Sequence, residues 1–165
     1  MKEAIGFSSE GMTPERAFAA YRRFYAQGAD VERLEGPFHA RLTGWRFRHM
    51  LLFDRHVTGV VHAREERVTT DGFDHIVLHH VLRGTLIGQA RSGFARAGPG
   101  DIVFLDTRRG HRIEAHDLHL VTASIARDLV LAALGSVGAL HGLVAHAPDT
   151  AMLSEFLQSL VRHAP

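Results

Sequence analysis

The spacing of hydrophobic residues divides the chain into a helical start, a long β-rich middle and a helical end. In residues 14–27 apolar side chains recur at helical spacing, which places Ala17, Tyr21 and Phe24 on one face. Pro14 suits the first position of a helix because its missing N–H is not needed there. We therefore predict a helix over residues 14–27, preceded by a flexible arm.

The pattern changes to strict alternation between residues 37 and 125, which is typical of β-strands. In the stretch 44–53, interpreted as one strand, every second residue falls on one face: Trp45, Phe47, His49, Leu51 and Phe53. Further strands are expected at 56–63, 66–70, 74–82, 85–90, 93–97, 101–105, 111–115 and 118–125. Turn signals separate them, among them Asp54-Arg55, Arg83-Gly84 and His116-Asp117. Many short strands without helices between them predict a β-sandwich or barrel.

Helical spacing returns after residue 126. A short helix is expected over residues 127–134, and a longer one from residue 150 to about residue 163. The longer helix carries an apolar stripe that includes Leu153, Phe156, Leu157 and Leu160. Such a stripe fits a helix that covers its own barrel and equally one that pairs with a second copy, so its spacing leaves both arrangements open.

Composition narrows the class of protein. The chain has 165 residues, about the length of one domain, with 45% hydrophobic and 22% charged residues, which excludes global disorder. The chain has no cysteine, which excludes a disulfide scaffold, a thiolate zinc site and a cysteine nucleophile. A net charge of +1 is too balanced for a domain that binds nucleic acid by charge alone.

No apolar run approaches the ~20 residues that a membrane-spanning helix needs. The first residues also lack the continuous apolar segment of a secretory signal. We therefore expect a cytoplasmic protein with no membrane partner.

Two stretches resemble the cupin sequence pattern. Residues 74–84 end in Val-Leu-Arg-Gly, like the first cupin motif, and Pro99-Gly100-Asp101 before an apolar strand resembles the opening of the second. Together with residues 45–62, 105–111 and 119–129, this ordered set resembles the N-terminal domain of AraC-type transcription regulators. The resemblance covers most of the chain, from about residue 17 to residue 165.

The resemblance implies a mainly β fold, a cupin-like double-stranded β-barrel (jelly roll) with one N-terminal and two C-terminal helices. Residues 1–36 would form the arm and first helix, residues 37–125 the barrel, and residues 126–165 the C-terminal helices. Together these residues would make a single sensory domain.

The function that the resemblance implies is effector binding and dimerisation, without enzymatic activity. A small molecule would bind in the barrel and control an attached DNA-binding domain. Two helix-turn-helix units usually follow the barrel in such regulators, and this chain has no room for them. We therefore expect contact with DNA only through a C-terminal domain that is not in this chain. The expected partners are a small-molecule effector and a second copy of the chain.

The 13 histidines raise the question of a metal site. Metal cupins use a His-x-His pair and a glutamate in the first motif, and a third histidine in the second. Val77 stands at the glutamate position, residues 70–73 contain no histidine, and only His111 stands at a ligand position. The usual ligand set is therefore missing, and no cofactor is expected.

A different metal set stays open. Alternation places His75 and His79 on one face of their strand, where they could approach His111 and bind a divalent metal. The alternative is that these histidines are hydrogen-bonded lining of a ligand pocket or part of the core.

We predict a ligand pocket inside the barrel, formed by an aromatic strand face and the barrel histidines. Its candidate residues are Trp45, Phe47, His49, His75, His79 and His111. The plainer interpretation of the Trp45 face is ordinary core.

Two other functions stay open. One is a stand-alone metal-dependent cupin enzyme, a dioxygenase or isomerase, that uses His75, His79 and His111. The other is an interaction or storage module without a small ligand. For a homodimer, the expected contact residues are Leu153, Phe156, Leu157 and Leu160.

Overall fold

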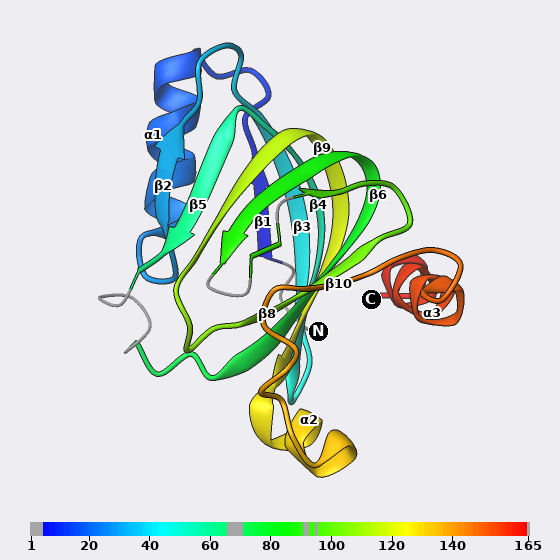
Figure 1. The fold of residues 1–165 in the computed structure, drawn as a ribbon. Coiled ribbons are helices and arrows are strands. Elements are labelled where there is room, and N and C mark those ends of the chain that lie inside the picture. Colours follow the sequence, from blue (N-terminus) through cyan, green and yellow to red (C-terminus); the bar gives the residue numbers. More distant parts are fainter. Residues whose placement is uncertain (1–4, 66–70, 91–92, 95, 165) are drawn as a thin grey trace.

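The computed structural model describes residues 5–65, 71–90, 93–94 and 96–164 (Figure 1). The helices are α1 (Pro14–Tyr25), α2 (Arg127–Leu134) and α3 (Ala151–Arg162). The strands are β1 (Ile5–Ser8), β2 (Asp30–Arg33), β3 (His39–Arg46), β4 (Met50–Thr58), β5 (Val60–Arg64), β6 (His75–Ala90), β7 (Arg96–Ala97), β8 (Ile102–Asp106), β9 (His111–Ala126) and β10 (Leu143–Ala145). No helix in the described ranges has both the length and the apolar character to span a membrane.

Two long antiparallel strands, β6 and β9, join the two halves of the barrel. The second half of β9 pairs with β4 and with the first half of β6, in a sheet ordered β1-β3-β4-β9-β6-β8-β10. The first half of β9 pairs with β5 and with the second half of β6, and β2 and β7 flank this part. The result is the cupin-like jelly roll that the sequence predicted.

The corner between the halves lies at Gly84 and Asp117. Both residues have positive φ, 83° and 47°, and the β6–β9 register shifts beside them. A Cβ atom at position 84 would lie 2.1 Å from the Asp117 carbonyl oxygen, so only glycine fits there. The sequence marked both positions as turns between separate strands. That prediction was wrong, because at these positions the strands bend and stay paired.

Strands β4, β6, β8 and β9 present one face to the barrel interior and the other to an outer core that also contains residues of α3. On β6, Val77 and Val81 belong to the interior core, which includes Tyr21 of α1. Ile76 and Leu78 belong to a second core on the outer face, which Leu157 of α3 completes. Figure 1 shows α1 beside β2 and β5, with α2 and α3 at the other side of the barrel.

Several element boundaries differ from those predicted. The expected flexible arm contains β1, which pairs with β3 along residues 5–8. Asp54-Arg55 is not a turn, because β4 runs through it. The helix predicted over 14–27 ends at Tyr25, and β2 and β10 were not predicted. The strand predicted at residues 66–70 lies outside the described residues.

An ion network holds the start of α2 against the barrel. Arg127, the first residue of α2, bonds to Asp106 at the end of β8 and to Asp74 just before β6. Asp74 also accepts a hydrogen bond from Arg108 at 2.6 Å. The network therefore joins α2 to two strands of the first sheet.

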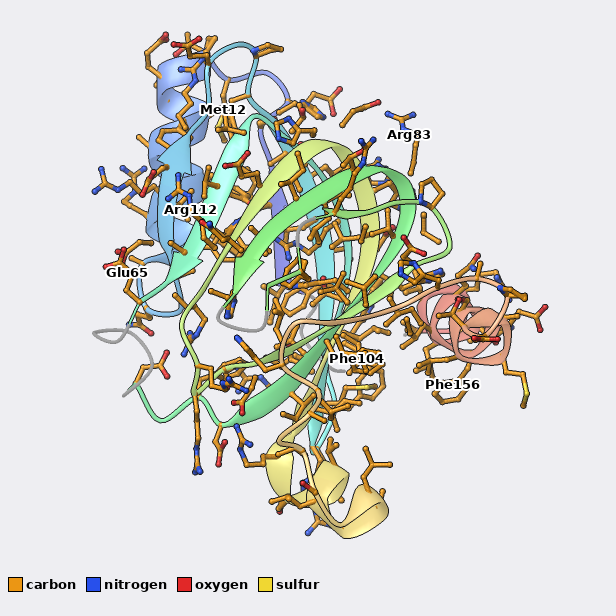
Figure 2. All side chains as sticks on the ribbon, viewed as in Figure 1. Met12, Glu65, Arg83, Phe104, Arg112 and Phe156 are labelled. Carbon is orange, nitrogen blue, oxygen red and sulfur yellow. The ribbon has the colours of Figure 1, made fainter. Side chains whose placement is uncertain are left out.

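Most of the apolar stripe of α3 packs against its own barrel. Leu157 is buried in the outer core, and Leu153 and Leu160 pack partly against it. We predicted that Leu157 contacts a second copy in a dimer. With α3 packed on its own barrel this prediction is wrong, because the Leu157 side chain has no free surface. Phe156 is 59% exposed and Met152 87% exposed. Figure 2 shows Phe156 on α3 at the margin of the molecule, with Phe104 of β8 nearer the barrel.

Candidate ligand-binding cavity

A cavity of about 450 Å³ lies inside the barrel. This volume is within the range of small-molecule pockets. Both halves of the barrel, the end of α1 and the segment after β5 line it. The lining residues are Phe24, Tyr25, Gln27, Gly28, Ala29, Leu51, Phe53, Arg55, His62, Arg64, Asp71, Phe73, Val77, His79, Leu105, Thr107, His111, Ile113, Thr122 and Ser124.

Strand register explains how distant residues meet on one wall. Thr122 of β9 lies opposite Phe53 of β4 on one side and His79 of β6 on the other. Because directly opposed residues in a sheet point to the same face, all three side chains face the cavity. Thr122 and His79 Nδ1 are hydrogen-bonded at 3.0 Å.

The aromatic wall depends on a glycine. Gly44 is the cross-strand partner of Phe53, and a Cβ atom there would lie 2.3 Å from the Phe53 ring. The absence of a side chain at position 44 leaves space for this ring, which lines the cavity.

Arg55 is the charged group in the middle of this interior. It is 7% exposed, and its guanidinium carbon lies 5.5 Å from the centre of the Tyr25 ring. The Tyr21 and Tyr25 side chains lie near enough to raise the pKa of Arg55 against the effect of burial. Its Nε atom is buried without a hydrogen-bond partner among the described residues. An arginine stays protonated at any physiological pH, so the cavity wall carries a buried positive charge.

A second arginine, Arg64, is fully engaged with protein groups. Its guanidinium donates to both carboxylate oxygens of Asp71, at 3.1 and 3.2 Å. It also donates to the Thr107 carbonyl at 3.2 Å and to the Gly28 carbonyl. Arg64 thereby ties the loop after α1 and the segment after β5 to the barrel rim.

Three histidines of the cavity are held neutral by burial. Burial lowers the pKa of His111 to about 4. Burial, and then the nearby charge of Arg55, lowers the pKa of His62 and His79 well below the ordinary value of 6.5. His62 Nε2 is hydrogen-bonded to the Tyr21 hydroxyl at 2.9 Å, and His111 Nδ1 donates to the Arg109 carbonyl at 3.1 Å. At neutral pH these rings act as polar, uncharged groups.

Of the predicted pocket residues, His79 and His111 line the cavity. The placement of Trp45, Phe47 and His49 was wrong, because the chain turns back at residues 47–49, with the Phe47 N–H bonded to the Met50 carbonyl. In the hairpin Trp45 pairs with Leu52, so both side chains face the outer core. Phe47 packs against that core, and His49 is exposed in the turn.

His75 also does not line the cavity, contrary to prediction. It is the first residue of β6, where its ring stacks on Phe73 at 4.1 Å between ring centres. Its Nδ1 atom is buried without a partner among the described residues. The alternation along this strand places Val77 and His79 on the face that lines the cavity. His75 lies beyond the edge of the cavity.

The cavity residues do not fit a cupin metal centre. His75 does not line the cavity with His79 and His111. The third histidine of the cavity lining is His62. The ligand atoms of these three cavity histidines do not converge as a metal site requires, in the part of the chain that the structure describes. The charge of Arg55, which acts on both His62 and His79, also opposes a bound cation.

One group outside the cavity does converge. Atoms of Asp54, His56 and His119, on the outer face of β4 and β9, lie within 4.8 Å of one another. The His119 Nε2 and Asp54 Oδ1 atoms are 2.7 Å apart, and the two histidine rings are stacked at 3.8 Å. This set has the ligand types of a divalent-metal site. Burial and His119 lower the pKa of His56, Asp54 raises it, and Arg41 and Arg83 lower it by less.

Sequence reasoning missed Arg55, His62, Arg64 and the hydroxyl residues of β9. Arg55 was assigned to a turn, although the alternation of Leu51 and Phe53 continues through it to Val57. A strand read without a break at Asp54-Arg55 would have placed Arg55 inside the barrel. The engagement of Arg64 with Asp71 has no comparable signal, because it is a tertiary contact that no local pattern contains.

Comparison with known proteins agrees with this architecture. No protein-family description matches the sequence, and no curated protein matches it. Among solved structures, the AraC-like transcriptional activator CuxR superposes with a TM-score of 0.87 at 17% sequence identity. The match covers 98% of this chain and 61% of that activator, so this chain spans less than two thirds of its length.

Two further structures are more distant. EutQ of Clostridium difficile has a TM-score of 0.44 at 10% identity, over 58% of this chain and 77% of that one. KdgF from a Halomonas species has a TM-score of 0.41 at 18% identity, over 62% of this chain and 93% of that one. Neither likeness is close enough to bear on this chain.

The fold class is therefore that of a cupin-like jelly-roll domain with flanking helices. It is the fold of the matched part of an AraC-like activator. The fold that the sequence resemblance implied is confirmed.

Proposed function

We propose that this chain is the effector-binding and dimerisation domain of an AraC-type transcription regulator. The observation that carries the proposal is the cavity of about 450 Å³, which is lined by a buried arginine and several aromatic rings. A core evolved only for stability would fill this volume with side chains. The likeness to an AraC-like activator over 98% of the chain supports the regulatory role.

The end of α1 is the element through which a ligand would act. Phe24, Tyr25 and the residues after them form one wall of the cavity, while α1 also packs on β2 and β3. A ligand that contacts this wall favours the arrangement of α1 that binds it better. That differential affinity is what shifts a population between two states, and an attached DNA-binding domain would read the shift.

Binding is tested with the small molecules of the cells that produce the protein. Purified protein is dialysed against a cell extract, and retained compounds are identified by mass spectrometry. The wild type is expected to retain a compound that the Ser124→Phe variant loses, because Ser124 lines the cavity and phenylalanine would fill it. Ser136→Phe, at an exposed position, is the control and retains the compound. Equal retention by both variants would contradict the proposal.

Regulation is tested separately in a chimera. The matched domain of the AraC-like activator is replaced by this chain, and a reporter gene is measured with and without the retained compound. A response that Ser124→Phe abolishes supports the sensory role. Binding without any change in reporter activity argues for a binding module that does not regulate transcription.

We propose a sensor in place of a metal-dependent dioxygenase or isomerase. The three cavity histidines do not converge, and Arg55 places a positive charge beside two of them. Metal titration followed by calorimetry tests this choice. Stoichiometric binding of iron or zinc that His111→Ala abolishes would favour the enzyme.

The proposed dimer forms through the exposed side of α3. Phe156 and Met152 are one helical turn apart and both are exposed, so they present an apolar surface to a second copy. Phe156→Glu is expected to lower the association constant at least tenfold in analytical ultracentrifugation, because a charge would be buried in the contact. Leu134→Glu is the matched control, since Leu134 of α2 is equally exposed. A wild type that sediments as a monomer would contradict this part of the proposal.

A further inference from the structure

We propose that the molecule bound in the cavity is an organic anion, with one carboxylate or other oxyanion paired with Arg55 and an apolar or aromatic body against the rings around it. This inference rests on the proposed function, because it names the chemical class of the effector for the same cavity. It goes further in assigning one residue the role of anion recognition.

Arg55 is a buried cation with an unsatisfied donor. Its side chain is almost completely buried, yet Nε has no hydrogen-bond partner among the described residues. The side chains that act on it, Tyr21 and Tyr25, are phenols and supply no carboxylate. A buried charge without a counter-ion is strongly unfavourable in a protein interior. Its presence is explained if a ligand supplies the missing negative charge.

The charges of the cavity lining do not balance. Among the described lining residues the carboxylate is that of Asp71, and both of its oxygens are bonded to Arg64. The cavity histidines are neutral at physiological pH, since burial depresses the pKa of each. Arg55 therefore leaves the cavity one positive charge in excess. A single anionic group is the complement to that excess.

Aromatic side chains surround the Arg55 guanidinium in the cavity. Tyr25 lies against the guanidinium, and Phe53, Phe24 and Phe73 also line the cavity. An arginine fork binds the two oxygens of a planar carboxylate in parallel hydrogen bonds. The hydroxyl of Ser124 lines the same cavity and can donate to a further oxygen. Aromatic and aliphatic side chains, among them Phe53, Leu51 and Ile113, form much of the remaining lining, and they fit an apolar or aromatic body of the ligand.

Arg64 has a different role, although it is also an arginine of the cavity. Its donors are bonded to Asp71, Thr107 and Gly28. An anion at Arg64 would have to displace Asp71 from a two-oxygen contact. Recognition is therefore assigned to Arg55 and support of the rim to Arg64.

The test uses two dyes that differ in one anionic group. 8-Anilinonaphthalene-1-sulfonate carries a sulfonate, and N-phenyl-1-naphthylamine is the same molecule without it. The Arg55→Met variant is expected to bind the sulfonate dye about 10–100-fold more weakly than the wild type, the loss typical of a charge-assisted hydrogen bond. Its affinity for the neutral dye should change less than threefold. Arg16→Gln, which removes an exposed positive charge on α1, is the matched control and should leave both affinities unchanged.

A competition experiment on the wild-type protein tests the same inference if the Arg55→Met variant fails to fold. It measures displacement of the bound neutral dye. 2-Naphthoate and 2-naphthyl phosphate are each titrated against the bound neutral dye, with 2-naphthamide as the uncharged comparison. One or both anions should displace the dye at a concentration at least tenfold lower than the amide, and the better one identifies the oxyanion. Equal displacement by the amide would overturn the inference.

The Ser124→Phe variant separates this inference from the proposed function. Dye binding that this substitution abolishes takes place in the cavity. If the neutral compounds bind there and the anions show no advantage, the anion assignment is wrong and the sensory cavity stands. If no compound binds in a manner sensitive to Ser124→Phe, the proposed function fails together with the inference.

Discussion

Replacing Arg127 by alanine is expected to lower the free energy of unfolding by about 3–5 kcal/mol, because one buried charge then loses its partner. The Arg127 and Asp106 side chains are only 10% and 9% exposed. Without the guanidinium, the Asp106 carboxylate stays buried at the end of β8 without its cation. The start of α2 also loses its bonds to two strands.

Urea unfolding, followed by circular dichroism, measures this loss. Arg108→Ala is the matched control, because Arg108 binds the same Asp74 but its side chain is 61% exposed. Exposed pairs contribute about 0–1 kcal/mol, so this variant should unfold close to the wild type. Similar midpoints for Arg127→Ala and Arg108→Ala would show that burial of the Arg127 pair does not stabilise the domain.

Stability is expected to fall as the pH is lowered from about 6.5 towards 4. An unfolded histidine takes up a proton below about pH 6.5. The His111 ring stays neutral in the fold down to its pKa of about 4, and burial also depresses the pKa of His62 and His79. The unfolded state therefore binds more protons in this window, and acid favours unfolding. Each buried histidine contributes up to about 1.4 kcal/mol per pH unit, and the full stability is present above pH 6.5.

Thermal unfolding between pH 7.5 and 4.5 checks the direction and the residue. His111→Gln should flatten the dependence, because glutamine does not titrate. His49→Gln, at an exposed position in the hairpin, should leave it unchanged. A melting temperature that rises on acidification, or that depends on pH equally in both variants, would contradict the role of buried imidazoles.

The stability of the cavity and its proposed function act against each other at Arg55. A buried charge without a partner destabilises the ligand-free domain. A hydrophobic residue of similar length would avoid this desolvation penalty. Binding of the anion removes this penalty. The bound state is therefore stabilised by the new contact and also by neutralisation of the buried charge. This gives a physical reason why ligand binding would tighten the wall formed by the end of α1.

The sequence by itself determined the architecture: α2 was placed at its observed bounds, α3 to within one residue at each end, and the β-rich middle was recognised as a barrel. It could do so because burial of one face imposes local periods on the chain, 3.6 residues in helices and 2 in strands. The same alternation placed His79 on the face that lines the barrel, as observed.

The tertiary structure alone decided which residues meet in the cavity. A reversal at residues 47–49 moved Trp45 to the outer core and left Phe53 inside, since a hairpin changes the face that a continuous strand would assign. Gly84 and Asp117 carry turn chemistry whether a strand ends there or bends, and only long-range pairing of β6 with β9 distinguishes the two. Arg55 lies in the interior because β4 continues past Asp54, held by partners more than 60 residues away on β9. Local patterns predict elements, whereas a binding site is made by contacts between elements, and those depend on register that no local pattern contains.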